Sequence, residues 1–328
     1  MVMVLVFLLQ GCSLSERPAD LQNRIYQVVE RVGSGVVVIK RYPPLDDIEV
    51  ACGVVMDKEG SIVTLSNILE NADSIEVAFQ DGCRMRGEVL GSDRETNLAI
   101  VTTPPHRCGV YPVKWAEADE VRIGTIGIVV GNSPAAKGVS AVWGLLSHSW
   151  VGGDDAYQDP MFLFSGSPQS YPCGNPVVNL EGKIVGLFDN YLENERGSWL
   201  VIPSTTIIRV YHKLKEHSRI MRGYLGIYGA GSQVTTDQGV VRGIEVQEVL
   251  DGSAGKQFGI LPEDLIIAAD GKEVRTMSDL RRIVTAKLPQ SPLNLKIWRG
   301  GIVQEITVIL DELKDSPWRL CRCPTRPL

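Results

Sequence analysis

Cysteine and histidine are the residues of this sequence whose side chains could bind a metal, form disulfides or take part in redox chemistry. The chain holds seven cysteines and four histidines. The pair Cys321 and Cys323 lacks the Cys-X-X-Cys spacing of redox and zinc motifs, and no histidine clusters with a cysteine pair. We therefore expect neither a metal site nor a cofactor. Apart from Cys12, six thiols could form three disulfides in several connectivities: Cys52, Cys83, Cys108, Cys173, Cys321 and Cys323.

Composition and charge restrict the class of protein. Hydrophobic residues make up 44% and charged residues 22% of the 328 residues, as in a folded globular chain of about two domains. The formal net charge is −6, and no basic run is present, so we expect no nucleic-acid binding. No apolar run reaches the roughly 18–20 residues of a membrane helix.

The N-terminus has the pattern of an export signal. Residues 2–9 are an unbroken apolar run, too short to span a bilayer and suited to a signal-peptide core. The following residues, Leu9-Gln10-Gly11-Cys12, resemble a bacterial lipobox, in which the cysteine becomes the lipidated N-terminus after cleavage. A buried N-terminal strand is the alternative, because no Lys or Arg precedes the apolar run. We therefore expect residues 1–12 to be a signal peptide and Cys12 to carry a lipid anchor.

Short strands are predicted for the segment from Gly33 to about Thr206. Gly and Pro, 33 and 18 in number, recur at short intervals and favour turns over long helices. Residues 36–39 and 53–56 are apolar runs bounded by turn residues. Residues 75–79 alternate in polarity, and Asp81-Gly82 then turns the chain back through 85–89, which predicts a hairpin. The pattern predicts a mainly β sandwich or barrel.

Helices are predicted at three places. The apolar residues between Leu21 and Val32 have helical spacing, so a short helix should follow a tether that begins at residue 13. The polar stretch 212–217 should end a helix that leads to a second domain. In that domain, residues 280, 283, 284 and 287 have helical spacing, and Gly300-Gly301 should turn a final hairpin. The tail, residues 313–328, is expected to be loosely held.

Six stretches in this order resemble the HtrA/DegP family, which has a trypsin-like double β-barrel followed by an α+β PDZ domain. They are ACGVV at 51–55, DKEGSIVTLSNIL at 57–69, GSDRETNLA at 91–99, GTIGIVVGN at 124–132 with GLLS at 144–147, CGNPVVNLEGKIVG at 173–186, and RGYLGI at 222–227. The resemblance implies a protease-like domain over residues 33–215, after a tether and helix over 13–32, and a PDZ domain over 222–312.

The same resemblance implies that all three positions of the catalytic triad have changed. The family's Thr-Asn-Asn-His falls on Thr64-Leu65-Ser66-Asn67, so the position of the catalytic histidine is Asn67. The catalytic aspartate falls on Asn97, and the nucleophile falls on Cys173. The oxyanion hole would use the backbone N–H groups of Cys173 and Tyr171, where the family has glycine at the earlier position.

These changes bear directly on hydrolysis. The triad mechanism needs a base that accepts the proton of the nucleophile and later returns a proton to the leaving amine. An Asn amide does not titrate near neutrality. We therefore expect a pseudoprotease. Two alternatives stay open: an active HtrA/DegP-like endoprotease that uses Cys173 with another base, and a thiol-based sensor.

The C-terminal domain keeps the peptide-binding pattern of the family. A PDZ domain adds an extended peptide to a sheet edge and holds its C-terminal carboxylate with backbone N–H groups. The resemblance places this groove at Tyr224, Leu225, Gly226 and Ile227, walled by Leu280, Ile283 and Val284. The alternative is a domain that only packs against its own protease-like domain.

Partners and location follow from the resemblance. We expect binding of unfolded proteins or C-terminal peptides, with a chaperone, scaffold or regulatory role in protein quality control of a bacterial envelope. A homo-oligomer, such as the trimer typical of the family, or a hetero-oligomer with an active homologue is expected. The protein would be exported to the periplasm and held at a membrane by its lipid anchor.

Overall fold

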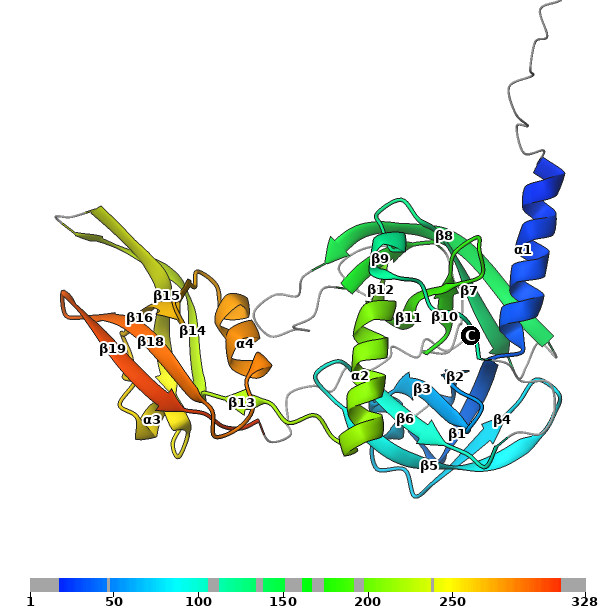
Figure 1. Cartoon of the computed structure of the whole chain (residues 1–328), viewed down its shortest axis with the longest axis horizontal. Helices are drawn as coiled ribbons and strands as arrows, with labels where there is room; N and C mark the ends of the chain where they lie inside the picture. Colours follow the sequence, from blue (N-terminus) through cyan, green and yellow to red (C-terminus); the bar gives the residue numbers. More distant parts are fainter. Residues whose placement is uncertain are drawn as a thin grey trace, which may run out of the picture.

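The computed structural model describes residues 18–313 except 46–47, 106–111, 134–137, 151–160, 167–173, 192–197 and 237–238. Two closed six-stranded β-barrels lie side by side, and a smaller β-rich domain follows them (Figure 1). In the first barrel the strand order is β1-β2-β3-β6-β5-β4. Its strands are β1 (Val36–Leu45), β2 (Ile48–Val55), β3 (Ser61–Leu65), β4 (Ser74–Ala78), β5 (Arg84–Asp93) and β6 (Leu98–Thr102).

Local sequence pattern accounts for several of these strands. All five residues of β3 are buried, including the polar Ser61 and Thr64, whereas β4 alternates between buried and half-buried residues. The predicted hairpin is confirmed, since β4 pairs with β5 in antiparallel fashion and Val77 lies opposite Met85. Cys83, which leads into β5, is a free thiol, so it takes part in none of the disulfides that the six cysteines could form.

The second barrel has the strand order β10-β11-β12-β9-β8-β7. A 3₁₀ helix, η2 (Ala118–Glu120), precedes it. Its interior is rich in aromatic groups, and the rings of Phe164 and Phe188 meet edge to face at 6.0 Å. Its strands are β7 (Ile126–Ser133), β8 (Gly138–Trp150), β9 (Met161–Ser165), β10 (Pro176–Val178), β11 (Ile184–Tyr191) and β12 (Ser198–Pro203).

Two helices pack on the barrels. Helix α1 (Pro18–Gly33) buries Val28 and Val32 against them. It begins three residues before the predicted start, so the end of the expected tether is helical. Helix α2 (Ser204–His217) contacts strands of both barrels and buries an apolar face that includes Ile207, Val210 and Leu214. The predicted helix that ends at 212–217 is thus confirmed, and it also joins the two barrels.

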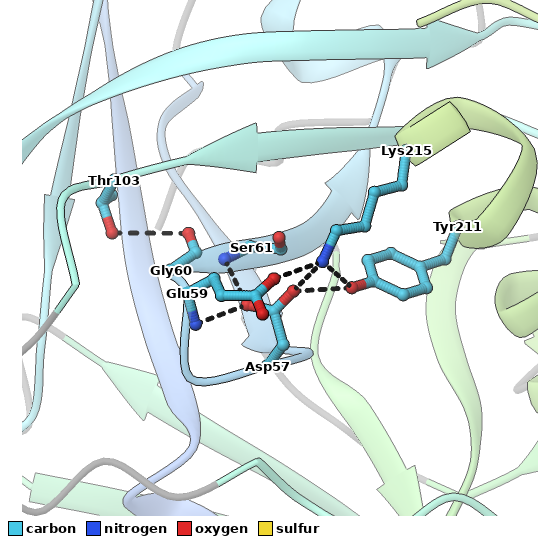
Figure 2. Close-up of polar contacts among 7 residues, drawn as sticks. All are labelled: Asp57, Glu59, Gly60, Ser61, Thr103, Tyr211 and Lys215. Atoms are coloured by element: carbon cyan, nitrogen blue, oxygen red, sulfur yellow. Dashed lines mark hydrogen bonds and ion pairs between the residues drawn. The ribbon is translucent and has the colours of Figure 1, made fainter. Parts of the chain in front are cut away.

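A polar cluster fixes the end of α2 to the turn between β2 and β3 (Figure 2). The Asp57 carboxylate accepts hydrogen bonds from the Tyr211 hydroxyl at 2.6 Å and from Lys215 Nζ at 2.8 Å. It also accepts from the backbone N–H groups of Glu59 and Ser61. Burial acts to raise the pKa of Asp57, but the bonds from Lys215 and Tyr211 outweigh burial and hold that pKa well below 3.8. We call Asp57, Glu59, Tyr211 and Lys215 the α2 clamp.

The C-terminal domain is built on a sheet with the strand order β14-β15-β16-β18-β19, in which β14 is an edge. The predicted helix and final hairpin are both present, as α4 and as β18–β19. The small strands β13 and β20 pair with each other, and β17 pairs with β16. The elements are β13 (Gly223–Tyr224), β14 (Ile227–Thr236), β15 (Gly239–Val249), α3 (Ala254–Gln257), β16 (Leu265–Ala269), β17 (Lys272–Glu273), α4 (Met277–Ala286), β18 (Pro292–Arg299), β19 (Ile302–Ile309) and β20 (Asp311–Glu312).

Ion pairs join this domain to the first barrel. The Arg222 guanidinium forms a two-pronged pair with the Asp93 carboxylate, with Nη2 2.8 Å from Oδ2, and both side chains are at least nine-tenths buried. Arg281, on α4, lies 4.0 Å from Glu95. Asp93 is the last residue of β5 and Glu95 lies in the turn that follows, so this end of the β5–β6 hairpin is the docking point of the C-terminal domain.

The predictions for the two ends of the chain lie outside the described residues. These are the signal peptide, the lipidated Cys12 and the loose tail from residue 314 onward. Within residues 18–313, excluding the gaps given above, no helix is long and apolar enough to cross a membrane.

Candidate functional site

Two of the predicted triad positions lie side by side. Strand β3 leads through Ser66 into a single 3₁₀ turn, η1 (Asn67–Leu69). The β5–β6 turn carries Asn97, whose backbone adopts the left-handed conformation at φ 54° that Asn tolerates better than most residues. The Asn97 side-chain Oδ1 accepts a hydrogen bond of 3.0 Å from the backbone N–H of Asn67. The structure thus brings Asn67 and Asn97 together, and their assignment to two triad positions stays a prediction.

Both polar atoms of the Asn97 side-chain amide form hydrogen bonds. Its Oδ1 also accepts a bond of 3.0 Å from the Ser66 hydroxyl, and its Nδ2 donates to the Asp189 carboxylate at 2.7 Å. Asn97 is buried and Asp189, on β11, is only 1% exposed. Asp189 was not among the predicted site residues. The signal that could have pointed to it is a carboxylate directly after the apolar run 184–188.

The third triad position and the oxyanion position, Cys173 and Tyr171, lie outside the described residues. The next residue, Gly174, has φ of 90°, and its N–H donates to the carbonyl of Phe188 at 2.8 Å. A Cβ at Gly174 would lie 2.2 Å from the carbonyl oxygen of Cys52, so only glycine fits there. The residue after the nucleophile position is therefore fixed between β2 and β11.

No described histidine takes the place of the general base at this centre. The position of the base is occupied by Asn67, whose Oδ1 is buried and accepts no hydrogen bond from the described residues. His148, His212 and His217 are all exposed, and none of them hydrogen-bonds to Asn67 or Asn97. His106 lies outside the described residues. In the described ranges, no three His, Cys, Asp or Glu side chains gather as a metal site would require.

The predicted peptide groove lies at an open sheet edge. Strand β14 pairs only with β15 along one side, and α4 lies against β14. Gly226 has φ of 75°, and a Cβ there would lie 2.1 Å from the Cβ of Ser253. The carbonyl groups of Leu225 and Gly226 accept bonds from Gly255 and Leu250. Their own N–H groups donate to no acceptor in the described part of the chain, which leaves two consecutive donors for a ligand.

The groove residues differ in exposure. Four of the seven predicted residues belong to the buried core of this domain: Leu225, Ile227, Leu280 and Val284. Ile283 packs against the same core and is half-buried, as is Tyr224. Apolar side chains that form the floor of a groove are mostly buried before the ligand arrives. Their role as groove residues stays a prediction.

Comparison with known proteins shows the class of fold. Residues 51–187 match the family model of the trypsin-like peptidase domain, and residues 223–310 match that of the PDZ domain. The serine endoprotease from Yersinia pestis superposes with a TM-score of 0.75 at 23% identity, over 91% of this chain and all of that one. The HtrA-type protease AlgW with a decapeptide superposes with a TM-score of 0.75 at 20% identity, over 89% of this chain and 99% of that one. The chain is thus a trypsin-like double barrel followed by a PDZ domain.

The sequence is also similar to those of curated endoproteases. A probable periplasmic serine endoprotease, DegP-like, of Chlamydia trachomatis serovar D is 27% identical over 80% of this chain and 54% of its own length. The periplasmic pH-dependent serine endoprotease DegQ of Escherichia coli K12 is 26% identical over 90% of this chain and 63% of its own length. The chain is thus similar to periplasmic endoproteases of the DegP and DegQ kind, and it spans about half to two-thirds of the length of these relatives.

Proposed function

We propose that this chain is an exported HtrA-like pseudoprotease. It would bind unfolded proteins or C-terminal peptides through its PDZ domain, without hydrolysing them, as a chaperone, scaffold or regulatory partner in the protein quality control of a bacterial envelope. The observation that carries the proposal is the pair of amides, Asn67 and Asn97, at adjacent positions of the trypsin-like site. Neither amide can take or return a proton near neutral pH.

Peptide binding is supported by the free edge of β14 and the two N–H donors of Leu225 and Gly226. An edge strand offers backbone groups to an extended peptide, and converging N–H groups suit a terminal carboxylate. A solved relative, the HtrA-type protease AlgW, carries a decapeptide. We propose the same kind of ligand here.

Location and assembly are also proposed from the relatives. DegP-like and DegQ proteins are named as periplasmic, which supports a periplasmic or envelope location for this chain. We propose that Cys12 anchors it to a membrane by a lipid. We further propose that it forms a trimer with itself or a mixed oligomer with an active homologue.

A cleavage assay tests the absence of hydrolysis. Purified protein beginning at residue 13 is incubated with unfolded casein beside its Cys173→Ala variant, with Escherichia coli DegP as the active control. We expect neither form of this protein to release fragments. Cleavage by the unchanged protein that disappears in Cys173→Ala would overturn the proposal and establish a cysteine endoprotease. Thiol titration of the native protein separately tests the sensor alternative, which requires a reactive Cys173.

A binding assay tests the PDZ groove. Peptides with apolar C-termini are titrated into the protein by calorimetry, each beside the same peptide with an amidated C-terminus. We expect binding of the free acids and weaker binding of the amides, because the amide removes the charge that the N–H groups attract. If neither form binds, the groove is not functional.

A further inference from the structure

A buried carboxylate, Asp189 on β11, lies beside Asn97, the position in the β5–β6 turn where the resemblance places the catalytic aspartate. Asp189 projects from β11 of the second barrel and accepts from Asn97 Nδ2 at 2.7 Å. Asn97 belongs to the β5–β6 turn of the first barrel. Both residues are at least 95% buried, so the bond joins the two barrels in an environment almost without water.

The orientation of the Asn97 amide follows from its neighbours. The backbone N–H of Asn67 can only donate, so the atom of Asn97 that faces it must be the oxygen. An ionised Asp189 can only accept, so the atom that faces it must be the nitrogen. An amide satisfies both neighbours at once, whereas a carboxylate at position 97 would place two acceptor oxygens about 2.7 Å apart, the distance now measured to Asp189.

We propose that Asn97 and Asp189 are an exchanged amide–carboxylate pair, in which the negative charge of the catalytic centre lies at position 189 instead of position 97. Asp189 is then the positioning residue that holds Asn97 in its non-catalytic role. The proposal rests on the proposed function, because the resemblance to active relatives places aspartate at position 97. It implies that restoring the triad residues alone does not restore the triad, since two adjacent buried carboxylates cannot both ionise.

The other charged residues at and before this turn also have partners. Asp93, at the end of β5, pairs with Arg222, Arg94 pairs with Glu70 at 3.1 Å, and Glu95 lies 4.0 Å from Arg281. On the η1 side, the partners of Asn97 are the neutral Ser66 hydroxyl and the Asn67 backbone. An added carboxylate at position 97 would therefore meet Asp189 as its nearest charged partner among the described side chains.

Moving the carboxylate from position 189 to position 97 in the full chain tests the pair through the free energy of unfolding. N97D, D189N and the double variant N97D/D189N are unfolded in urea at pH 7.5 and at pH 5. At pH 7.5 we expect N97D to raise the unfolding equilibrium constant at least about tenfold, because like charges adjoin in a buried site. The destabilisation of N97D should be smaller at pH 5, where the two carboxyl groups can share a proton. The double variant should recover most of the wild-type value, because its amide and carboxylate have changed places.

Two results would overturn the proposal of an exchanged amide–carboxylate pair. One is an N97D variant as stable as wild type at pH 7.5. The other is a double variant no more stable than N97D, including the case in which both fail to fold. The N97D/D189N variant is the decisive comparison, because a residue with a merely structural role would give additive losses.

A titration distinguishes a positioning role from simple packing. N67H introduces an imidazole in the wild-type background and in the N97D/D189N background, and its pKa is followed by NMR. A carboxylate at position 97 raises that pKa, so we expect a value at least about one unit higher in the exchanged background. Equal values would refute the placement of the charge. Both experiments are independent of casein cleavage, so the pseudoprotease proposal and the exchanged pair can fail separately.

Discussion

Asp57→Asn is the substitution that most directly tests how the α2 clamp holds the molecule together. In wild type, one carboxylate oxygen of Asp57 accepts from two backbone N–H groups, and the other accepts from Tyr211 and Lys215. The amide can keep the backbone bonds through its oxygen. Its nitrogen, however, faces the Lys215 ammonium, which only donates.

The cost can be worked out bond by bond. The Tyr211 hydroxyl donates to the oxygen that becomes the amide nitrogen, so the charged bond is replaced by a neutral one in which Tyr211 accepts; Tyr211 is buried, and about 1–2 kcal/mol is lost. The Lys215 side chain is 40% exposed and keeps its ion pair with Glu59 at 2.6 Å. Losing its bond to Asp57 therefore costs less than about 1 kcal/mol. We expect Asp57→Asn to lower the free energy of unfolding by about 2 kcal/mol at pH 7. Glu59→Gln, at a side chain 75% exposed, is the matched control and should cost under about 0.5 kcal/mol.

The pH dependence has a definite sign. The pKa of Asp57 in the folded protein lies well below 3.8, so its contribution is fully present above pH 3.8 and is lost as the pH falls toward the folded-state value. At pH 3 the unfolded chain takes up a proton that the folded clamp does not. The difference between wild type and Asp57→Asn should therefore shrink by about 1 kcal/mol between pH 7 and pH 3. This difference is measured by urea unfolding at both pH values, with circular dichroism as the signal. An unchanged difference, or equal losses in Asp57→Asn and Glu59→Gln, would refute the reasoning.

Three further substitutions have expected outcomes. Arg222→Met leaves its carboxylate partner buried and unpaired and should cost about 3–5 kcal/mol in urea unfolding; removing both partners should cost less than the sum of the two single changes. Thr276→Ala removes the cap of α4 and should destabilise the PDZ domain by about 1 kcal/mol, measured by hydrogen exchange of that helix. Gly226→Ala should abolish peptide binding in calorimetry, because its Cβ has no space, whereas Gly252→Ala, with the same φ of 75° in open space, should retain binding.

Local pattern in the sequence was enough to predict the β4–β5 hairpin and helix α4. Alternation and an Asp-Gly turn specify the first, and apolar residues at spacings of three and four specify the second. The pairing of Asn67 with Asn97 came from the family resemblance rather than from spacing, because 30 residues separate them. Periodicity carries no information on contacts at that range.

Three contacts escaped prediction for the same reason. Asp189 meets Asn97 from 92 residues away, and Asp57 meets Lys215 from 158 residues away. Asp93 meets Arg222 from 129 residues away. Each carboxylate looks like an ordinary turn or strand-end residue in the sequence. Only the closure of two barrels, and the helix that crosses both, brings each partner into place.

The pair between Asp93 and Arg222 also bears on the order in which the chain is completed. A protein is synthesised from its N-terminus, so the first barrel is made before Arg222 exists. Until then Asp93 must stay in water, because burying an unpaired carboxylate costs several kcal/mol. The segment with Asp93 at the end of β5 and Asn97 in the following turn therefore reaches its final buried state only after the second barrel, α2 and the start of the PDZ domain have been made. A nascent chain that stops before residue 222 contains the sequence of both barrels but lacks the partner that lets Asp93 become buried.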